Sequence, residues 1–109
     1  MKIAISNNKG FVAEHFGRCE NYEVFEIENN QIKNKEILNN PGHEPFFLPK
    51  FLKEKNINIL ISQGAGPRAI KLINDLKMKI IIVEKQENNT AIKKFLNGEL
   101  KETNNSCNH

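Results

Sequence analysis

Apolar residues in this chain of 109 gather in a few dense runs, separated by stretches rich in asparagine, lysine and glycine. Three of these runs, residues 1–6, 56–62 and 79–83, are almost continuous. Such runs are typical of strands that are covered on both faces. They predict the buried centre of a sheet.

Residues 21–28 follow a different pattern, in which apolar side chains stand among acidic ones. This alternation predicts a strand with one buried face. Asn29 and Asn30 tolerate the positive φ values of a tight turn, so residues 31–38 are expected to return antiparallel to the strand before them. Residues 7–19 are polar and contain glycine, which predicts a loop.

Three segments, residues 46–55, 67–77 and 91–97, carry apolar residues at helical spacing. Thr90 is placed to cap the third helix, and Gly98 suits its end. The order of elements is therefore β-β-β-α-β-α-β-α. This order predicts an α/β fold with a mixed sheet and helices on its faces.

The chain is long enough for one domain, which we expect over residues 1–100, followed by a polar tail over residues 101–109. The formal net charge is only +3, and the lysines are scattered among glutamates. Because no basic stripe is interleaved with aromatic residues, no nucleic-acid partner is expected.

No membrane partner is expected either, because no run reaches the ~18 apolar residues of a membrane span. No charged-then-apolar leader precedes the first strand. We therefore expect a cytoplasmic protein whose cysteines are reduced.

Two loops are candidates for a binding site, because ligands of open α/β sheets bind beyond the carboxyl ends of parallel strands. If the first and fourth strands are parallel neighbours, residues 7–19 and the loop Gln63-Gly64-Ala65-Gly66 lie at the same edge. The second loop leads into Pro67, which suits the first helical position, where free N–H groups face an anion. Arg68 adds a permanent, forked positive charge. An anion site is predicted here; the alternative is that the glycines only form a tight strand-to-helix turn.

The pattern Gly64-x-Gly66-x-x-Ala69 also matches the dinucleotide-binding fingerprint, and Glu84 stands where a ribose-binding acid would be. Pro67 argues against this function, because it removes an N–H group from the phosphate cradle. The chain is also too short for two mononucleotide-binding halves. A nucleotide- or small-anion-binding regulatory module is therefore the alternative function.

Two Cys–His pairs supply candidate metal ligands: His15 with Cys19, and Cys107 with His109 at the end of the chain. Thiolate and imidazole suit zinc, copper(I) or iron–sulfur species. For the first pair the alternative to metal binding is structural: His15 would be a packed ring and Cys19 a small buried apolar side chain. The protein is not expected to be an enzyme, because Asp75 is its only aspartate and no strand presents paired carboxylates for magnesium.

Four motifs occur in the order in which one protein family carries them, over essentially the full length of the chain. They are His15-Phe16-Gly17-Arg18, Pro45-Phe46-Phe47-Leu48-Pro49-Lys50-Phe51-Leu52, Gly64-Ala65-Gly66-Pro67-Arg68-Ala69 and Phe95-Leu96-Asn97-Gly98-Glu99-Leu100, with Cys107-Asn108-His109 at the end. The chain thus resembles a small, single-domain member of the dinitrogenase iron–molybdenum cofactor biosynthesis family. It departs from the family at residues 84–89, which are charged and polar where a glycine-rich segment is usual.

The resemblance implies a three-layer α/β/α fold of the ribonuclease H-like type, with a five-stranded mixed sheet. It also implies a non-catalytic carrier or scaffold for an anionic metal–sulfur cluster, iron–sulfur or molybdenum-containing, as in nitrogenase cofactor carriers and the molybdenum–copper-binding orange proteins. The expected partners are cluster donor and acceptor proteins, and the chain itself is expected to be a monomer or a weak homodimer.

The expected site divides into two groups of residues. The anionic cluster would be held by Arg18, Gly64, Ala65, Gly66, Pro67 and Arg68. Metal would be bound by His15, Cys19, Cys107 and His109, provided that the tail folds back over the site.

Overall fold

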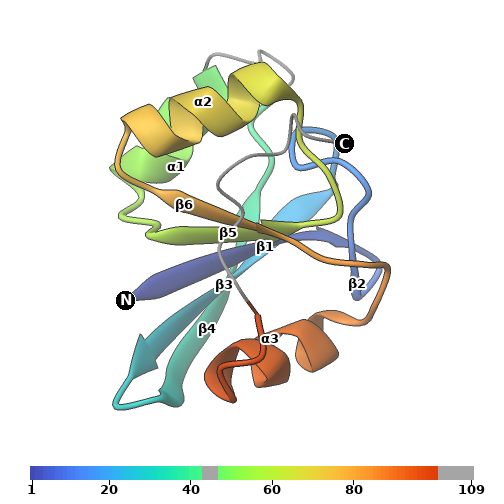
Figure 1. The fold of residues 1–109 in the computed structure, drawn as a ribbon, viewed down its shortest axis with the longest axis vertical. Helices are drawn as coiled ribbons and strands as arrows, with labels where there is room; N and C mark the ends of the chain where they lie inside the picture. The colour runs from blue at the N-terminus through green and yellow to red at the C-terminus, as the bar shows by residue number, and fades with distance from the viewer. Residues whose placement is uncertain (43–46, 101–109) are drawn as a thin grey trace.

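The computed structural model describes residues 1–42 and 47–100, in which the strands and helices follow the predicted order with one addition (Figure 1). The elements are β1 (Lys2–Asn8), β2 (Phe11–Val12), β3 (Asn21–Glu28), β4 (Gln31–Asn39), α1 (Phe47–Glu54), β5 (Ile59–Ser62), α2 (Pro67–Asp75), β6 (Lys79–Ile82) and α3 (Asn88–Leu96). The addition is β2.

The strands form a mixed sheet in the order β4-β3-β1-β5-β6, with β2 paired to the end of β1. β1, β5 and β6 are parallel, whereas β3 and β4 are antiparallel to their neighbours. The register Ile3↔Ile59 and Ala4↔Leu60 shows that the first and fourth predicted strands are parallel neighbours, which is the condition for the two candidate loops to share one edge. Their carboxyl ends therefore meet at one edge of the sheet.

Helices cover both faces of this sheet: α1 and α2 lie on one face and α3 lies on the other (Figure 1). β1 shows the reason, because successive side chains of a strand point to opposite faces. Ala4 belongs to the core that contains Leu52 of α1 and residues of α2, whereas Ile3 and Ile5 belong to the core that contains Ile92 of α3. A strand that is apolar on both faces thus requires a helical layer on each side.

The β3–β4 hairpin forms as predicted. Asn29 and Asn30 have φ values of 53° and 63°, and Glu28 pairs with Gln31 across the turn. Both asparagines adopt the left-handed conformation that a two-residue turn of this kind requires. β4 lies at the edge of the sheet and is exposed along most of its length.

β2 corrects two predictions: the loop over residues 7–19, and the five-stranded sheet. In the part of the chain that the structure describes, the sheet has six strands. Lys9 and Gly10 turn the chain with φ values of 55° and 88°, so that Phe11 and Val12 pair back on β1. A strand of two residues is too short to show a period in the sequence.

The start of α3 is a second correction. The helix begins at Asn88, earlier than predicted, so Thr90 is not its N-cap; Glu87 is, and no side chain caps the helix. A tertiary contact accompanies this start, since the Asn88 N–H donates to Gly10 O at 3.0 Å. The predicted end is confirmed, because Gly98 has a φ of +76°, the left-handed conformation common after a helix.

The other two helices agree with their predicted positions to within a few residues. Both are amphipathic: α1 buries Leu48 and Leu52, and α2 buries Ile70 and Ile73. No helix in residues 1–42 and 47–100 is long and apolar enough to cross a membrane.

Candidate functional site

Two loops lie together at the carboxyl edge of β1 and β5. The first loop, residues 13–20, joins β2 to β3, and the second, residues 63–66, joins β5 to α2 (Figure 1). Their backbones are hydrogen-bonded, with the Phe16 N–H donating to Gly64 O at 3.0 Å. The parallel pairing of β1 and β5 accounts for this contact, because it brings the two strand ends to the same place.

Gly64 is required for this close approach. A Cβ atom at this position would lie 3.0 Å from Glu14 O, closer than such atoms normally come to a backbone oxygen. The hydroxyl of Ser62 strengthens the junction, because it lies 3.3 Å from Ala13 O and 3.2 Å from Gly64 O, within reach of either as donor. The first predicted glycine of the loop therefore has a definite structural role, which is to let the two loops touch.

The two loops, α1 and the start of α2 border an open cavity of about 640 Å³. Its lining consists of His15, Phe16, Gly17, Arg18, Cys19, Leu48, Ala65, Gly66, Arg68 and Ala69. Phe16, Cys19 and Leu48 are buried, whereas Arg18 and Arg68 are exposed. The cavity thus combines an apolar interior with a cationic mouth.

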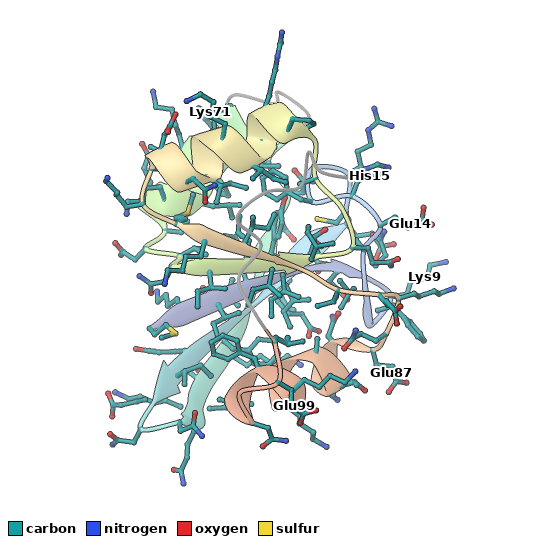
Figure 2. The ribbon with its side chains drawn as sticks, viewed as in Figure 1. Lys9, Glu14, His15, Lys71, Glu87 and Glu99 are labelled. Atoms are coloured by element: carbon teal, nitrogen blue, oxygen red, sulfur yellow. The ribbon has the colours of Figure 1, made fainter. Side chains whose placement is uncertain are left out.

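The two arginines come from different elements, Arg18 from the first loop and Arg68 from the first turn of α2, and neither is neutralised within residues 1–42 and 47–100. Among the described residues, neither guanidinium makes an ion pair or a side-chain hydrogen bond, since the ion pairs formed there all involve lysines. His15 is also exposed, and Figure 2 shows it with Glu14 on the outer side of the first loop. Two unpaired guanidinium groups at one mouth attract an anion, because their field is not cancelled within the described molecule.

The start of α2 adds hydrogen-bond donors to the same cavity. Gly66 is the N-cap in extended conformation, Pro67 follows it, and no side chain caps the helix. The first bond within the helix runs from the Ile70 N–H to Gly66 O. The N–H groups of Arg68 and Ala69 therefore lack partners within the helix and are available to a bound anion.

Cys19 lines the cavity as a buried thiol with only 7% of its surface exposed. Burial raises the pKa of this thiol above its usual value of 9.0, and hydrogen bonds from its neighbours offset the rise only in part. At neutral pH the thiol therefore keeps its proton, which it donates to Phe16 O at a distance of 3.7 Å. Metal binding needs the thiolate, so Cys19 is a ligand only where a bound metal displaces this proton.

The structure brings some of the predicted residues together and leaves others apart. The cavity is lined by His15, Arg18, Cys19, Ala65, Gly66 and Arg68. Gly64, in the second loop, and Pro67, the first residue of α2, are not part of its lining. Cys107 and His109 lie outside the described residues. Within the described residues, no group of three or more His, Cys, Asp or Glu side chains is placed to hold a metal ion.

Glu84, the acid of the alternative nucleotide site, is exposed and does not line the cavity. The segment that follows it is instead bound to β2, with the Val12 N–H donating to Gln86 O at 2.9 Å. None of the charged and polar residues 84–89 lines the cavity.

Four residues of the cavity lining, Phe16, Gly17, Leu48 and Ala69, were not predicted as site residues, and Ala69 was considered as one only through the alternative nucleotide fingerprint. Leu48 and Ala69 contribute apolar lining, and Asn40 binds the first loop from outside the cavity. Helical spacing indicated that Leu48 is buried but not what it faces. For Asn40 the sequence offers no signal, because it stands among other turn residues.

Fold and cavity together define a class: a small mixed α/β protein with an arginine-bearing cleft at the carboxyl edge of its parallel strands. The model of the dinitrogenase iron–molybdenum cofactor family matches residues 1–98. The chain therefore belongs to this family, as its motifs indicate.

Individual relatives agree with this assignment. An uncharacterized protein of Methanocaldococcus jannaschii, MJ0580, is 32% identical over 105 residues, which cover 92% of this chain and 89% of that protein. The crystal structure of PH0822 has a TM-score of 0.84 at 31% identity and covers 94% of this chain and 96% of that one. The apo form of the orange protein from Desulfovibrio gigas has a TM-score of 0.80 at 18% identity, covering 94% and 92% of the two chains, and shows the same fold.

Proposed function

We propose that this chain is a non-catalytic carrier of an anionic metal–sulfur cluster, iron–sulfur or molybdenum-containing, which it binds in the cavity between its two loops. One observation carries the proposal: Arg18 and Arg68, unpaired among the described residues, stand at the mouth of one cavity. Membership of the dinitrogenase iron–molybdenum cofactor family supports the choice of cargo.

The character of the cavity favours a sulfur-rich anion over a hydrated oxyanion. Phe16, Leu48 and Ala69 present apolar surface to whatever enters. A strongly hydrated anion such as phosphate loses water against such walls without regaining hydrogen bonds there. A cluster with a polarisable, weakly hydrated body loses less, while the arginines and the N–H groups of α2 bind its charge.

The remaining parts of the proposal follow from the same site. As a carrier, the chain is proposed to bind and release its cargo without a catalytic step. Cytoplasmic cluster donor and acceptor proteins are the expected partners. The helices on both faces of the sheet also support the three-layer, ribonuclease H-like arrangement that the family implies.

Anaerobic reconstitution with iron, sulfide and molybdate, followed by metal analysis, tests the proposal. We expect the wild-type protein to retain metal and the Arg18→Ala/Arg68→Ala variant to lose it. Lys85→Ala is the matched control, because it removes an exposed positive charge outside the cavity. A wild-type protein that retains no metal contradicts the proposal. If a Cys19→Ala/Cys107→Ala variant retains as much metal as wild type, the two thiols are not ligands, and the rest of the proposal stands.

The alternative, a nucleotide- or small-anion-binding regulatory module, rests on the free N–H groups at the start of α2. Thermal-shift measurements against a panel of nucleotides distinguish the two functions. Stabilisation by a nucleotide, together with no metal retained, favours the regulatory module. No thermal stabilisation by millimolar nucleotide argues against the regulatory module and in favour of the carrier function.

A further inference from the structure

We propose that Asn40 is a positioning residue, whose side-chain amide holds Arg18 at the mouth of the cavity. The inference deepens the proposed function and rests on it, because Arg18 is one of the two groups that bind the cargo. Asn40 follows β4 at the edge of the sheet and belongs to neither of the two loops.

The contacts of Asn40 lie on both sides of Arg18. Its Nδ2 group donates to Cys19 O at 2.9 Å and to Gly17 O at 3.3 Å. It also lies 3.9 Å from Cys19 Sγ. One amide thus fixes the backbone immediately before and immediately after the arginine.

The orientation of this amide is itself determined. Its Oδ1 atom accepts a hydrogen bond from the Gly42 N–H at 3.0 Å, so Nδ2 is the end that faces the first loop. Asparagine alone satisfies all these partners, because it joins an acceptor and a two-hydrogen donor on a short side chain. An aspartate here would present a carboxylate oxygen to two carbonyl oxygens.

Other hydrogen bonds also hold this loop, on both sides of Arg18. Before it, Phe16 O accepts from the Tyr22 hydroxyl at 2.6 Å, and the Arg18 N–H donates to His15 O at 3.2 Å. After it, the Glu20 N–H donates to Asn8 Oδ1 at 2.8 Å and to Asn7 O at 3.2 Å, one residue beyond the carbonyl groups that Asn40 binds. Among the described residues, Asn40 is the side chain that reaches both flanks of the arginine. Without it, two carbonyl groups lose their donor and the guanidinium must be ordered by the ligand, which weakens binding.

A double-mutant cycle tests whether Asn40 acts through Arg18. The probe is tetrathiomolybdate, an anionic molybdenum–sulfur species, with binding measured by anaerobic equilibrium dialysis. We expect Asn40→Ala to weaken binding about tenfold. The Arg18→Ala/Asn40→Ala variant should then bind no more weakly than Arg18→Ala, whereas the effects of Asn40→Ala and Arg68→Ala should add. A full additional tenfold loss in the Arg18→Ala background overturns the proposal, as does unchanged binding by Asn40→Ala.

A second measurement on the protein without ligand keeps this inference separate from the proposed function. We expect hydrogen exchange over residues 15–20 to be faster in Asn40→Ala than in wild type, while Lys85→Ala leaves it unchanged. If wild type binds no tetrathiomolybdate, the proposed cargo is wrong, and exchange alone decides the role of Asn40. Unchanged exchange over this segment contradicts that role.

Discussion

The carboxyl edge of the parallel strands is open beyond β5 and closed beyond β6. Beyond β5, residues 63–66 border the arginine-bearing cavity. Beyond β6, the chain is bound to β2: the Val12 N–H donates to Gln86 O at 2.9 Å, and Phe11 forms an antiparallel bridge with Glu87. The carboxyl edge of the parallel strands can therefore bind a ligand only where the hydrogen-bond donors of the loop after the strand are not already bonded within the protein.

Polar groups are used differently at the two ends. At the closed end the backbone and Asn88 bind neighbouring segments, with Asn88 Nδ2 donating to Asn7 Oδ1 at 2.6 Å in a buried position. Two buried oxygens there, Gln86 Oε1 and Asn88 Oδ1, have no partner among the described residues. At the open end the two guanidinium groups and the first N–H groups of α2 have no partner among the described residues. The closed end therefore contributes to stability, and the open end is the one available to a ligand.

The largest effect is expected from removing the charges of the open end. Arg18→Ala and Arg68→Ala should each weaken tetrathiomolybdate binding about tenfold, and the double variant about a hundredfold, because each removes a charged hydrogen-bond donor worth roughly 1.5 kcal/mol. Lys85→Ala at the closed end should change it less than about twofold, since long-range surface charge is screened by salt. Anaerobic dialysis measures both. If Lys85→Ala weakened binding as much as Arg18→Ala or Arg68→Ala, the net charge of the protein, rather than the cavity, would be what binds the anion.

A smaller effect is expected from forcing the two loops of the open end apart. Gly64→Ala places a Cβ atom 3.0 Å from Glu14 O and should lower the free energy of unfolding by about 2 kcal/mol. Gly66→Ala is the matched control for stability, because no atom lies within 4 Å of its Cβ position. Urea denaturation measures the difference. Equal stability of the two variants would mean that the loops separate without cost.

At the closed end, Asn88→Ala should lower the free energy of unfolding by about 1 kcal/mol, because one buried hydrogen bond to Asn7 is lost. The loss is moderate, since Asn7 Oδ1 still accepts from the Gly10 N–H at 2.9 Å. Anion binding should not change. Dialysis and urea denaturation of the same variant separate these outcomes, and weaker anion binding would contradict the division between the two ends.

The smallest effect is expected from the Cys19 thiol. Burial raises its pKa in the folded protein above 9.0, so the unfolded chain releases this proton first as the pH rises. The contribution of the thiol is therefore fully present below pH 9 and is lost as the pH rises toward the folded-state pKa. Wild type should lose more stability than Cys19→Ala between pH 8 and 10, as measured by urea denaturation at each pH. If wild type and Cys19→Ala lost the same free energy of unfolding over this range, the pKa of the Cys19 thiol would not be raised by folding.

Much of the fold could be predicted from local patterns. The continuous apolar runs identified the parallel strands, and Asn29 and Asn30 identified the hairpin turn. β2 and the start of α3 could not be predicted, because hydrogen bonds between distant residues accompany both. The Asn88 N–H, for example, donates to Gly10 O, and neither residue carries a local sign of the other.

The site shows the same division. Arg18 could be identified because it belongs to the short motif His15-Phe16-Gly17-Arg18, and Arg68 because it follows the glycine-containing loop after a parallel strand. The burial of Cys19 and the contacts of Asn40 could not, since both depend on how β4 and the first loop pack together. The predicted roles of Cys107 and His109 stay predictions, because both lie outside the described residues.

By itself, the sequence determined the order and kind of the elements other than β2, and it indicated the family. The parallel pairing that sets the two loops side by side was a condition of the predicted site, and the structure meets it. The tertiary structure decided which end of the strand edge is open, that two arginines face one cavity, and that the thiol beside them keeps its proton. The reason is physical. Periodicity and turn propensity act over a few residues, whereas cavities, burial and long-range hydrogen bonds arise only when distant segments pack against one another.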